Sequence, residues 1–295
     1  EGREAPLDAA FAGAMRAILT DAGLDAAFKE LVLTLPSATV VAETLGSDID
    51  PQRIHVARES LRAALARELR AEWEAVFESL QDRGGYSPDA RSAGRRALAN
   101  LALANLVADA TERGDAVWPG RAYQRVKDAG NMTDRFGALA ALVNAHAALA
   151  EPALAHFHAM FKDEALVIDK WFALQAAAPE REGRVFARVR TLTQHPDFTV
   201  RNPNRARSLL TTLMLMNPAA FHRPDAAGYV FWAERVAEID AINPQLGARL
   251  ARAMDRWRGL AEPYRSAARE AISRVAQRPE LSDDTREIVQ RALAD

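Results

Sequence analysis

A helical spacing of apolar residues runs through almost the whole chain, interrupted only by short breaks. Between Asp50-Pro51 and Gln81, for example, apolar residues fall on one helical face: Ile54, Leu61, Leu65, Leu69, Trp73, Val76 and Leu80. Alanine, the strongest helix former, supplies 62 of the 295 residues. No segment shows the alternation of apolar and polar residues that is typical of a strand. The sequence therefore predicts an all-α fold.

Polar and proline signals divide the chain into about fourteen expected helices. Asp50-Pro51, Asn202-Pro203 and Asn243-Pro244 each pair an N-cap residue with proline at the first helical position. Ser37, Ser87-Pro88 and Thr133 are further expected starts, and Gly84-Gly85 is an expected break. The expected helices cover residues 7–20, 24–35, a short segment after 37, 51–81, 88–109, 115–130, 133–148, 152–161, 164–177, 181–193, 203–216, 225–242, 244–260, 262–277 and 282–294.

The breaks between these helices are mostly two to eight residues long, so neighbouring helices should pack antiparallel. We expect a superhelical, α-solenoid-like array of the armadillo or HEAT kind, with an irregular helical bundle as the alternative. No fixed sequence period identifies a named repeat. No long linker appears, so we expect residues 1–295 to form a single helical domain.

Composition narrows the possible partners. The net charge of −2 provides no general attraction for nucleic acid or anionic membranes, so neither is an expected partner. No run approaches the roughly 18–20 apolar residues of a membrane helix, and no signal peptide opens the chain. Cysteine is absent, which fits a reducing compartment, and we expect a cytoplasmic protein. Glu1-Gly2-Arg3 is an unusual beginning, so we expect a boundary within a longer protein.

Catalytic and metal-binding patterns are missing from the sequence. His156 and His158 lie two residues apart, which on a helix places them about 200° apart around the axis and prevents shared coordination of one ion. There is no His-Glu-x-x-His, no Gly-x-Ser-x-Gly and no phosphate-binding glycine loop. The acidic pairs Asp163-Glu164 and Asp283-Asp284 stand where helices begin, where capping explains them. We therefore expect neither catalysis nor a metal in this chain.

Arginine outnumbers lysine 34 to 4 and is concentrated between Arg181 and Arg207. That segment holds seven arginines against Glu182 and Asp197. It is either a solvated helix face or a positive wall for a carboxylate-bearing ligand, since the arginine fork grips carboxylates bidentately. Nucleic acid fits less well, because the net charge of the chain is negative.

Aromatic residues gather in two places. The first group is Trp171 and Phe172, which we expect to pack in the core with the charges of Asp169-Lys170 at the rim. The second group, which we also expect in the core, has a partner interface as its alternative: Phe221, Tyr229, Phe231 and Trp232.

An ordered set of short motifs spans nearly the whole chain: Leu33-Thr34-Leu35-Pro36-Ser37, Asn131-Met132-Thr133-Asp134, Asp169-Lys170-Trp171-Phe172, Asn202-Pro203-Asn204-Arg205-Ala206-Arg207, Asn217-Pro218-Ala219-Ala220-Phe221-His222, Gly228-Tyr229 and Asn243-Pro244-Gln245. In order and spacing this set resembles the C-terminal helical domain of bacterial aminopeptidase N, a zinc-dependent alanyl/lysyl aminopeptidase of the gluzincin metalloprotease family.

The resemblance implies an accessory domain that caps a catalytic domain on the same polypeptide. In that family the last domain encloses a chamber around the zinc and shapes the access of peptides to it. The resemblance also implies that Arg207 and Arg249 line this substrate channel and meet the carboxylate end of a peptide. The zinc ligands and the other catalytic residues belong to earlier domains, so the resemblance implies a hydrolase parent and a fragment that is inactive alone, without a cofactor.

Two rival hypotheses remain. One is a free-standing α-solenoid that serves as a protein-binding scaffold. The other is an enzyme of an unrecognised kind, which a tightly bound ion or ligand would reveal. The N-terminal residue preference of the parent enzyme is not encoded in any motif of this chain.

Overall fold

The computed structural model describes residues 6–81 and 85–294. Its contacts divide the chain into two compact units: the first is Glu1–Pro36 with Val56–Asp163, and the second is Ser37–His55 with Glu164–Asp295. Glu1-Gly2-Arg3 and Gly84, which carry the expected chain boundary and part of the Gly84-Gly85 break, lie outside the described residues. That residues 1–295 form a single domain stays a prediction.

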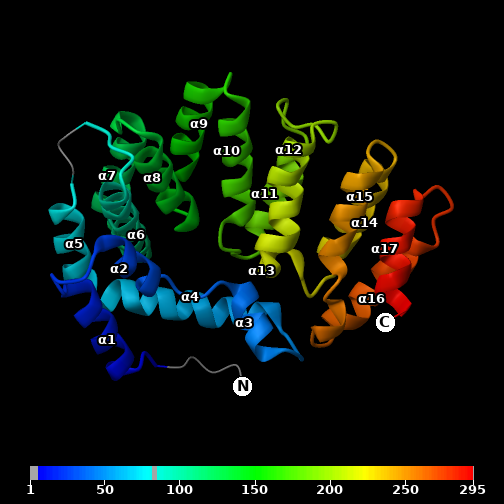
Figure 1. The fold of residues 1–295 in the computed structure, drawn as a ribbon, viewed down its shortest axis with the longest axis horizontal. Helices are drawn as coiled ribbons and strands as arrows, with labels where there is room; N and C mark the ends of the chain where they lie inside the picture. Colours follow the sequence, from blue (N-terminus) through cyan, green and yellow to red (C-terminus); the bar gives the residue numbers. More distant parts are fainter. Residues whose placement is uncertain (1–5, 82–84, 295) are drawn as a thin grey trace. The chain divides into compact units, whose positions relative to one another are not determined.

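The first unit consists of helices in the blue-to-green part of the chain (Figure 1). The boundary between the units falls inside α4, so only the greater part of that helix belongs here. The helices are α1 (Ala9–Thr20), α2 (Ala26–Leu33), α4 (Pro51–Glu68), α5 (Arg70–Ser79), α6 (Ala90–Glu112), α7 (Val117–Asp128), α8 (Met132–Asn144) and α9 (Ala150–Phe161).

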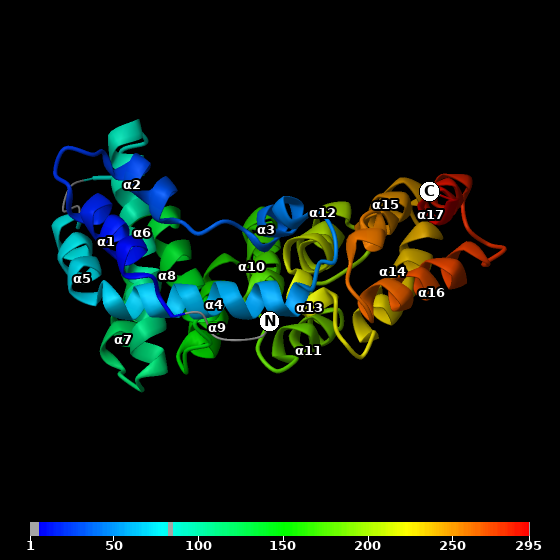
Figure 2. The same cartoon turned by 90° about the horizontal axis from the view of Figure 1, so that it is seen from below.

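The second unit also holds the start of α4, and its last four α-helices pack side by side (Figure 2). Its elements are α3 (Ala38–Leu45), α10 (Ala165–Ala177), α11 (Arg184–Leu192), α12 (Pro203–Ala206), the π-helix η1 (Arg207–Met216), α13 (Pro218–Phe221), α14 (Ala227–Asp240), α15 (Pro244–Ala251), the 3₁₀ turns η2 (Arg252–Met254) and η3 (Trp257–Gly259), α16 (Tyr264–Ala276) and α17 (Asp283–Ala294).

The all-α prediction is confirmed. Seventeen α-helices and three π or 3₁₀ segments make up the regular structure of the described residues. Their only extended pairing is an isolated bridge between Ile49 and Leu260. None of the described helices combines the length and apolarity that crossing a bilayer requires.

Helix starts that depend on one capping side chain were predicted best. Ser37, Asp50, Asn202 and Asn243 each accept a hydrogen bond from a backbone N–H of the first turn, at 3.2, 3.0, 3.0 and 3.1 Å. These caps satisfy donors that have no partner inside the helix. The local sequence therefore determines these four starts.

Two starts lie two residues from the predicted positions. Asp89, not Ser87, caps α6: its carboxylate accepts from the Ser92 N–H at 2.9 Å, while the Ser87 hydroxyl donates to the same carboxylate. Asn131, not Thr133, caps α8 by accepting from the Asp134 N–H at 2.9 Å. In both places two residues that can cap a helix lie two positions apart in the sequence. Spacing alone does not show which of the two accepts the hydrogen bond from the first turn.

Three predicted long helices are divided, and the short helix α13 (Pro218–Phe221) was not predicted, so the structure has more elements than expected. The helix expected over 51–81 bends at buried Leu69, whose φ of −105° and ψ of 21° separate α4 from α5. The helix expected over 203–216 becomes a π-helix from Arg207 onward. The helix expected over 244–260 stops at Ala251 and continues as two 3₁₀ turns. Apolar spacing cannot register these small changes in winding.

The core of the first unit is built around α6, which packs against α2, α5, α7 and α8. A helix with neighbours on most sides needs apolar residues around most of its circumference. Accordingly, α6 buries the Leu98, Leu103, Leu106 and Val107 side chains. Its alanines allow close approach of the neighbouring backbones, which accounts for the high alanine content of this stretch.

The core of the second unit is aromatic. Trp232 and Phe221 are fully buried, and Tyr229 is 1% exposed, as predicted for this cluster. The Trp232 Nε1 donates to the Leu250 carbonyl at 3.1 Å, which ties α14 to α15. Gly228 lets α14 pass close to α13, because a Cβ atom at that position would lie 1.9 Å from the Phe221 carbonyl oxygen.

We expect Gly228→Ala to lower the free energy of unfolding by about 3 kcal/mol, because the methyl group meets a backbone atom that moves only if α13 shifts. Gly13→Ala is the matched control: it is also a helical glycine, but nothing lies within 4 Å of its added Cβ. The control should stabilise by about 0.5–1 kcal/mol through helix propensity. Urea unfolding measures both, and equal effects of the two substitutions would contradict the close approach.

Candidate functional site

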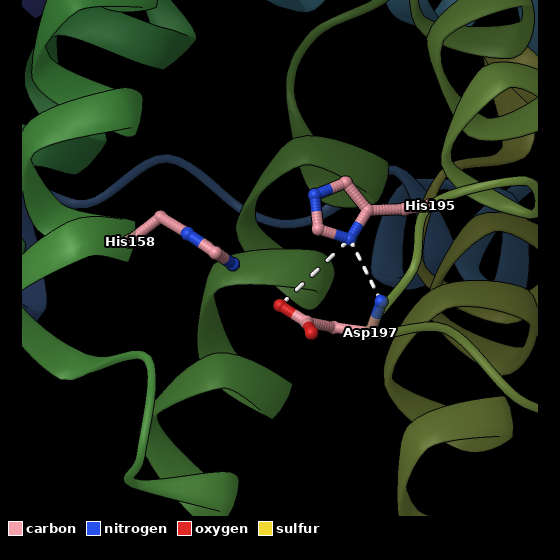
Figure 3. Close-up of side chains that lie close together, drawn as sticks. All are labelled: His158, His195 and Asp197. Carbon is pink, nitrogen blue, oxygen red and sulfur yellow. Dashed lines mark hydrogen bonds and ion pairs between the residues drawn. The ribbon is translucent and has the colours of Figure 1, made fainter.

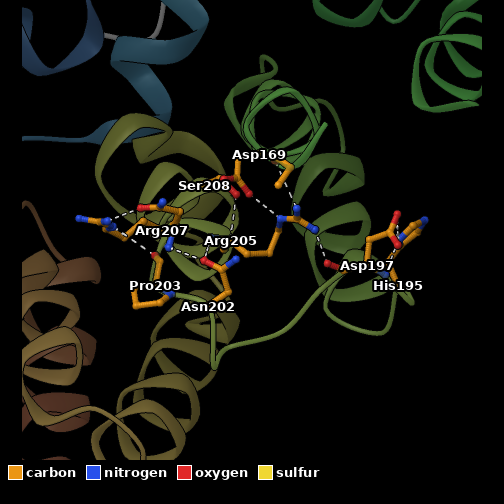
Figure 4. A network of polar contacts seen from close by, with 10 residues as sticks. Asp169, His195, Asp197, Asn202, Pro203, Arg205, Arg207 and Ser208 are labelled. Atoms are coloured by element: carbon orange, nitrogen blue, oxygen red, sulfur yellow. Dashed lines mark hydrogen bonds and ion pairs between the residues drawn. The ribbon is translucent and has the colours of Figure 1, made fainter. Parts of the chain in front are cut away.

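The segment from Asn202 to Arg207 begins a helix and carries two arginines with different environments (Figure 4). The Asn202 side chain accepts from the N–H groups of Asn204 and Arg205 at 3.0 and 3.3 Å. Pro203 occupies the first helical position, where its missing N–H costs no hydrogen bond. After this single α-turn the winding changes, and Arg207 is the first residue of the π-helix.

Arg205 is a buried structural clamp. Its side chain is 8% exposed and pairs through Nε with the Asp169 carboxylate of α10. Its Nη1 donates to the Asp197 carbonyl, and its Nη2 donates to the Ala165 carbonyl at 3.4 Å. The guanidinium also lies over the Phe172 ring, 5.1 Å from the centroid. The Arg205 side chain thus joins α12 to α10 and to the loop that precedes α12.

The loop before Asn202 is held by a second group of contacts. The Nδ1 atom of His195 accepts from the Asp197 N–H at 3.1 Å and lies 3.9 Å from the Asp197 carboxylate (Figure 3). The imidazole packs against the Trp171 and Phe172 rings, with centroids 5.4 and 5.6 Å away. Trp171 and Phe172 are buried, as predicted for this aromatic pair. The loop is therefore fixed to α10 by both ring stacking and hydrogen bonds.

The arginine-rich stretch does not form one continuous positive wall. Arg205 is buried and neutralised, and Arg184 pairs with Glu182 at 3.1 Å in an exposed position. Burial lowers the pKa of Arg188 from its ordinary value. Asp169, expected at the rim, instead neutralises Arg205 thirty-six residues away. Counting charges along the sequence therefore overstated the positive surface.

Arg207 and Arg249 are the two sequence-predicted site residues, and both lie in the second unit. Arg207 is half-buried and donates to the Pro203 carbonyl at 3.1 Å and to the Asn204 side chain. Arg249 is exposed on α15, and within the described part of the chain it has no hydrogen-bond or ion-pair partner. The two side chains share no hydrogen-bonding group, and only Arg249 is ready to receive a carboxylate without giving up an internal bond.

The helix that carries Arg249 is firmly placed. Asn243 caps it, and the Leu250 carbonyl accepts from the buried Trp232. Gly247 allows α15 to approach Asp240, since a Cβ there would lie 2.8 Å from the Asp240 Cα. Asp240 in turn accepts from the Ser282 N–H at 2.7 Å at the start of α17. An exposed arginine thus projects from a fixed backbone.

Within each unit taken by itself, the described residues do not form a zinc site. Within either unit, the described residues hold no group of three histidine, aspartate or glutamate side chains close enough to share an ion. His156 and His158 lie on the unbroken helix α9, on either side of buried Phe157, as their spacing predicted. The helix-borne pair with a glutamate that zinc peptidases need is absent from the sequence.

A cavity in the second unit was not predicted. It has a volume of about 750 Å³ and lies between α3, the end of η1 and the η2–η3 turns. Its wall is mostly apolar and includes Ile49, Ile54 and Met214. His222 is its histidine, and its Nδ1 lies 2.9 Å from the Tyr229 hydroxyl. The Asn217-Pro218 pair predicts a turn, and this turn leads into the cavity wall. No pattern in the sequence predicted the cavity itself.

Burial controls the charge of His222. It lowers the pKa of the imidazole from 6.5 to about 4, because the charged form loses its hydration. The pKa of Tyr229 is raised, first by burial and then by the nearby Tyr264. At neutral pH the pair is therefore an uncharged hydrogen-bonded unit in the cavity wall.

Comparison with known proteins gives these features a context. A family described as "Domain of unknown function (DUF3458_C) ARM repeats" matches residues 1–294. The chain is 38% identical over 283 residues to aminopeptidase N of Caulobacter vibrioides, covering 96% of this chain and 32% of that protein. It is 34% identical over 294 residues to aminopeptidase N of Escherichia coli, covering 100% of this chain and 33% of that protein.

A solved structure shows the same fold. It is the crystal structure of Legionella pneumophila aminopeptidase A in complex with aspartic acid, with a TM-score of 0.87 and 25% identity. The match covers 99% of this chain and 34% of that one. The chain therefore spans about a third of the length of the relatives that it matches.

The fold is all-helical, as the helical spacing predicted, and the match to a family of ARM repeats confirms the expected solenoid-like array over the irregular bundle. The chain belongs to the DUF3458_C family of ARM-repeat domains. The ordered motifs resemble the C-terminal helical domain of bacterial aminopeptidase N. The similarity of the chain to two such proteins confirms this resemblance.

We expect Arg205→Ala to lower the free energy of unfolding by about 3–5 kcal/mol, because it leaves the largely buried Asp169 without its partner. Asp169→Ala should cost a similar amount, and the double variant should cost less than the sum of the two. Arg184→Ala, which removes an exposed ion pair, is the control and should change stability by less than about 0.5 kcal/mol. Additive losses in a thermal and urea double-mutant cycle would argue against direct coupling.

Acid should destabilise the second unit through His222. The folded-state pKa of about 4 lies below the unfolded value, so the unfolded chain binds the proton more tightly between pH 6.5 and 4. The stability that neutral His222 provides is full above pH 6.5 and is lost as the pH falls toward 4. Between pH 7 and 4, wild type should lose about 2–3 kcal/mol more than His222→Gln. Parallel stability curves for the two proteins in urea titrations would rule this out.

Proposed function

We propose that the chain is the C-terminal accessory domain of a zinc-dependent aminopeptidase N, which removes N-terminal amino acids from peptides. In this role it caps the catalytic domain of the same polypeptide and shapes the path by which peptides reach the zinc. The observation that carries the proposal is the similarity of nearly the whole chain to only a third of two aminopeptidases N.

The division of labour follows from the residues that are present. Hydrolysis by a zinc peptidase needs a metal-activated water and a group that stabilises developing charge, held together in one site. The sequence lacks the His-Glu-x-x-His pattern, and within either unit the described residues hold no such ligand set. The proposal therefore assigns the zinc and the reacting groups to another part of the parent protein. The contribution of this domain is binding and exclusion: it limits what reaches the metal and orients what enters.

Arg207 and Arg249 are the proposed contacts for the distal carboxylate of a peptide. Their guanidinium groups can bind a carboxylate through two parallel hydrogen bonds. Arg249 is exposed and has no partner in the described part of the chain, while Arg207 is already oriented by Pro203 and Asn204. An amino-acid anilide has no distal carboxylate and would not use either side chain.

The parent enzyme with Arg207→Ala and Arg249→Ala combined should show a KM for short peptides raised about tenfold or more, since charge-assisted hydrogen bonds are worth about 1.5–3 kcal/mol. Its KM for an alanine anilide should change little. Arg274→Ala, which removes an exposed i,i+4 pair with Glu270, is the matched control and should affect neither substrate. Steady-state kinetics with both substrates measures the difference.

Two outcomes would count against the proposal. Equal losses on peptides and anilides would remove the carboxylate role of the two arginines. Zinc-dependent hydrolysis of the anilide by the 295-residue chain alone would show that the reacting groups are here and not in another domain.

A further inference from the structure

A second cavity lies wholly within the first unit, between α1, α2, the junction of α4 and α5, and α6. Its volume is about 160 Å³, and eight of its twelve lining residues are apolar. Cavities of about 150 Å³ with apolar walls stay dry and bind ligands of the size of benzene. The open space therefore suits a small apolar body better than a group of water molecules.

Trp73 contributes an unused hydrogen-bond donor to the wall of this cavity. The indole is 2% exposed, and within the described residues its Nε1 atom is buried without a hydrogen-bond partner. Buried indole N–H groups usually find an acceptor, as Trp232 does with the Leu250 carbonyl. The protein supplies no acceptor to Trp73 in the part that is described, so an occupant of the cavity is the partner available to its N–H.

The bend between α4 and α5 places Trp73 at the cavity. Leu69 interrupts the helical winding, and Leu65 before the bend and Trp73 after it both line the same space. From α6, the wall receives Asn105, whose Nδ2 donates to the Leu101 carbonyl at 2.9 Å. Asn105 carries no charge and therefore does not exclude an anion.

Two arginines give the cavity a positive charge. Arg58 and Arg62 lie one turn apart on α4, both line the cavity, and no acidic residue is among the residues that line it. Arg62 is paired with Glu59 at 2.6 Å. Arg58 donates through Nε to the Pro36 carbonyl at 2.6 Å, and no carboxylate of the described residues pairs with it. The Arg58 guanidinium is thus oriented by one bond, while its two Nη groups stay available for an anion.

We propose that this cavity binds a small carboxylate with an apolar body, such as a branched or cyclic aliphatic acid. The apolar body occupies the space beside the leucine side chains, and the carboxylate accepts from the Trp73 N–H and balances the charge of Arg58. An arginine binds a carboxylate through parallel hydrogen bonds, which the Nη groups can supply. The site lies in one unit and does not depend on the proposed function, because it needs neither the zinc nor another domain.

Proton–nitrogen NMR of the tryptophan indoles in the 295-residue chain tests the site. The chain has five tryptophans, and the indole resonance that Trp73→Phe removes belongs to Trp73. Cyclohexanecarboxylate is the probe, since its saturated ring causes no ring-current shift. It should move the Trp73 N–H proton downfield and saturate with a Kd of about 0.1–1 mM, as expected for a ligand of this size. The Trp232 resonance should stay in place, because its N–H already donates to the Leu250 carbonyl.

Substitutions separate recognition of the charge from simple filling of the cavity. Arg58→Gln should weaken binding of cyclohexanecarboxylate about tenfold or more and leave binding of the neutral cyclohexanecarboxamide unchanged. Arg67→Gln, on the same helix but exposed and outside the cavity, is the matched control and should change neither affinity. Trp73→Phe keeps an aromatic ring but removes the N–H, so it should weaken binding of the carboxylate about fivefold. Ligand-detected NMR measures these affinities, and an unchanged Trp232 resonance shows that each variant is folded.

Three results would overturn the proposal. A Trp73 resonance that does not move at probe concentrations well above the expected Kd would show that the cavity does not take this class of ligand. Equal affinity of the wild type for the carboxylate and the carboxamide would assign the cavity to a neutral acceptor. A bound water that keeps its nuclear Overhauser contact with the Trp73 N–H in the presence of the probe would identify solvent as the missing partner. None of these measurements involves peptide hydrolysis, so failure of the proposed function would leave them unaffected.

Discussion

The buried ion pair between Arg205 and Asp169 sets the geometry of the candidate site. A guanidinium withdrawn from water is stable only when its charge is paired and its donors are satisfied. Arg205 meets this condition with Asp169, two backbone carbonyls and the face of the Phe172 ring. Lysine could not replace it, because a single ammonium cannot reach these partners with a planar fork. The clamp holds the α12 turn, and Arg207 begins the π-helix directly after that turn.

The two candidate arginines offer different means of binding one kind of group. Arg207 is oriented by bonds to its own first turn, so it loses little rotamer freedom on binding but must exchange an existing partner for a carboxylate. Arg249 has no such partner to lose and must be ordered when a ligand arrives. In the carboxylate site proposed above, one donor is therefore oriented in advance and the other adjusts to the ligand.

Local signals in the sequence predicted whatever depends on a few neighbouring residues. The caps at Asn202 and Asn243 and the buried pair Trp171 and Phe172 are of this kind. The structure departs from expectation where the cause is distant: Asp169 neutralises Arg205 from thirty-six positions away, and no charge count along the chain reveals it. The π-winding after Arg207 is equally hidden, because the apolar spacing of ten residues fits either helix. The cavity around His222 is formed by segments far apart in sequence.

The contrast between α6 and α3 shows where the same apolar signal leads to different results. In α6, apolar residues bury themselves against four neighbouring helices, so the helix is complete within its unit. In α3, a similar proportion of apolar residues is fixed in place by caps and hydrogen bonds, yet none is buried. Because about half of each side chain is exposed, Val40 and Leu45 each forfeit about 1 kcal/mol that full burial would contribute. The position of α3 therefore depends on its capped ends and on the backbone hydrogen bonds of Ile49, and not on burial of its own apolar residues.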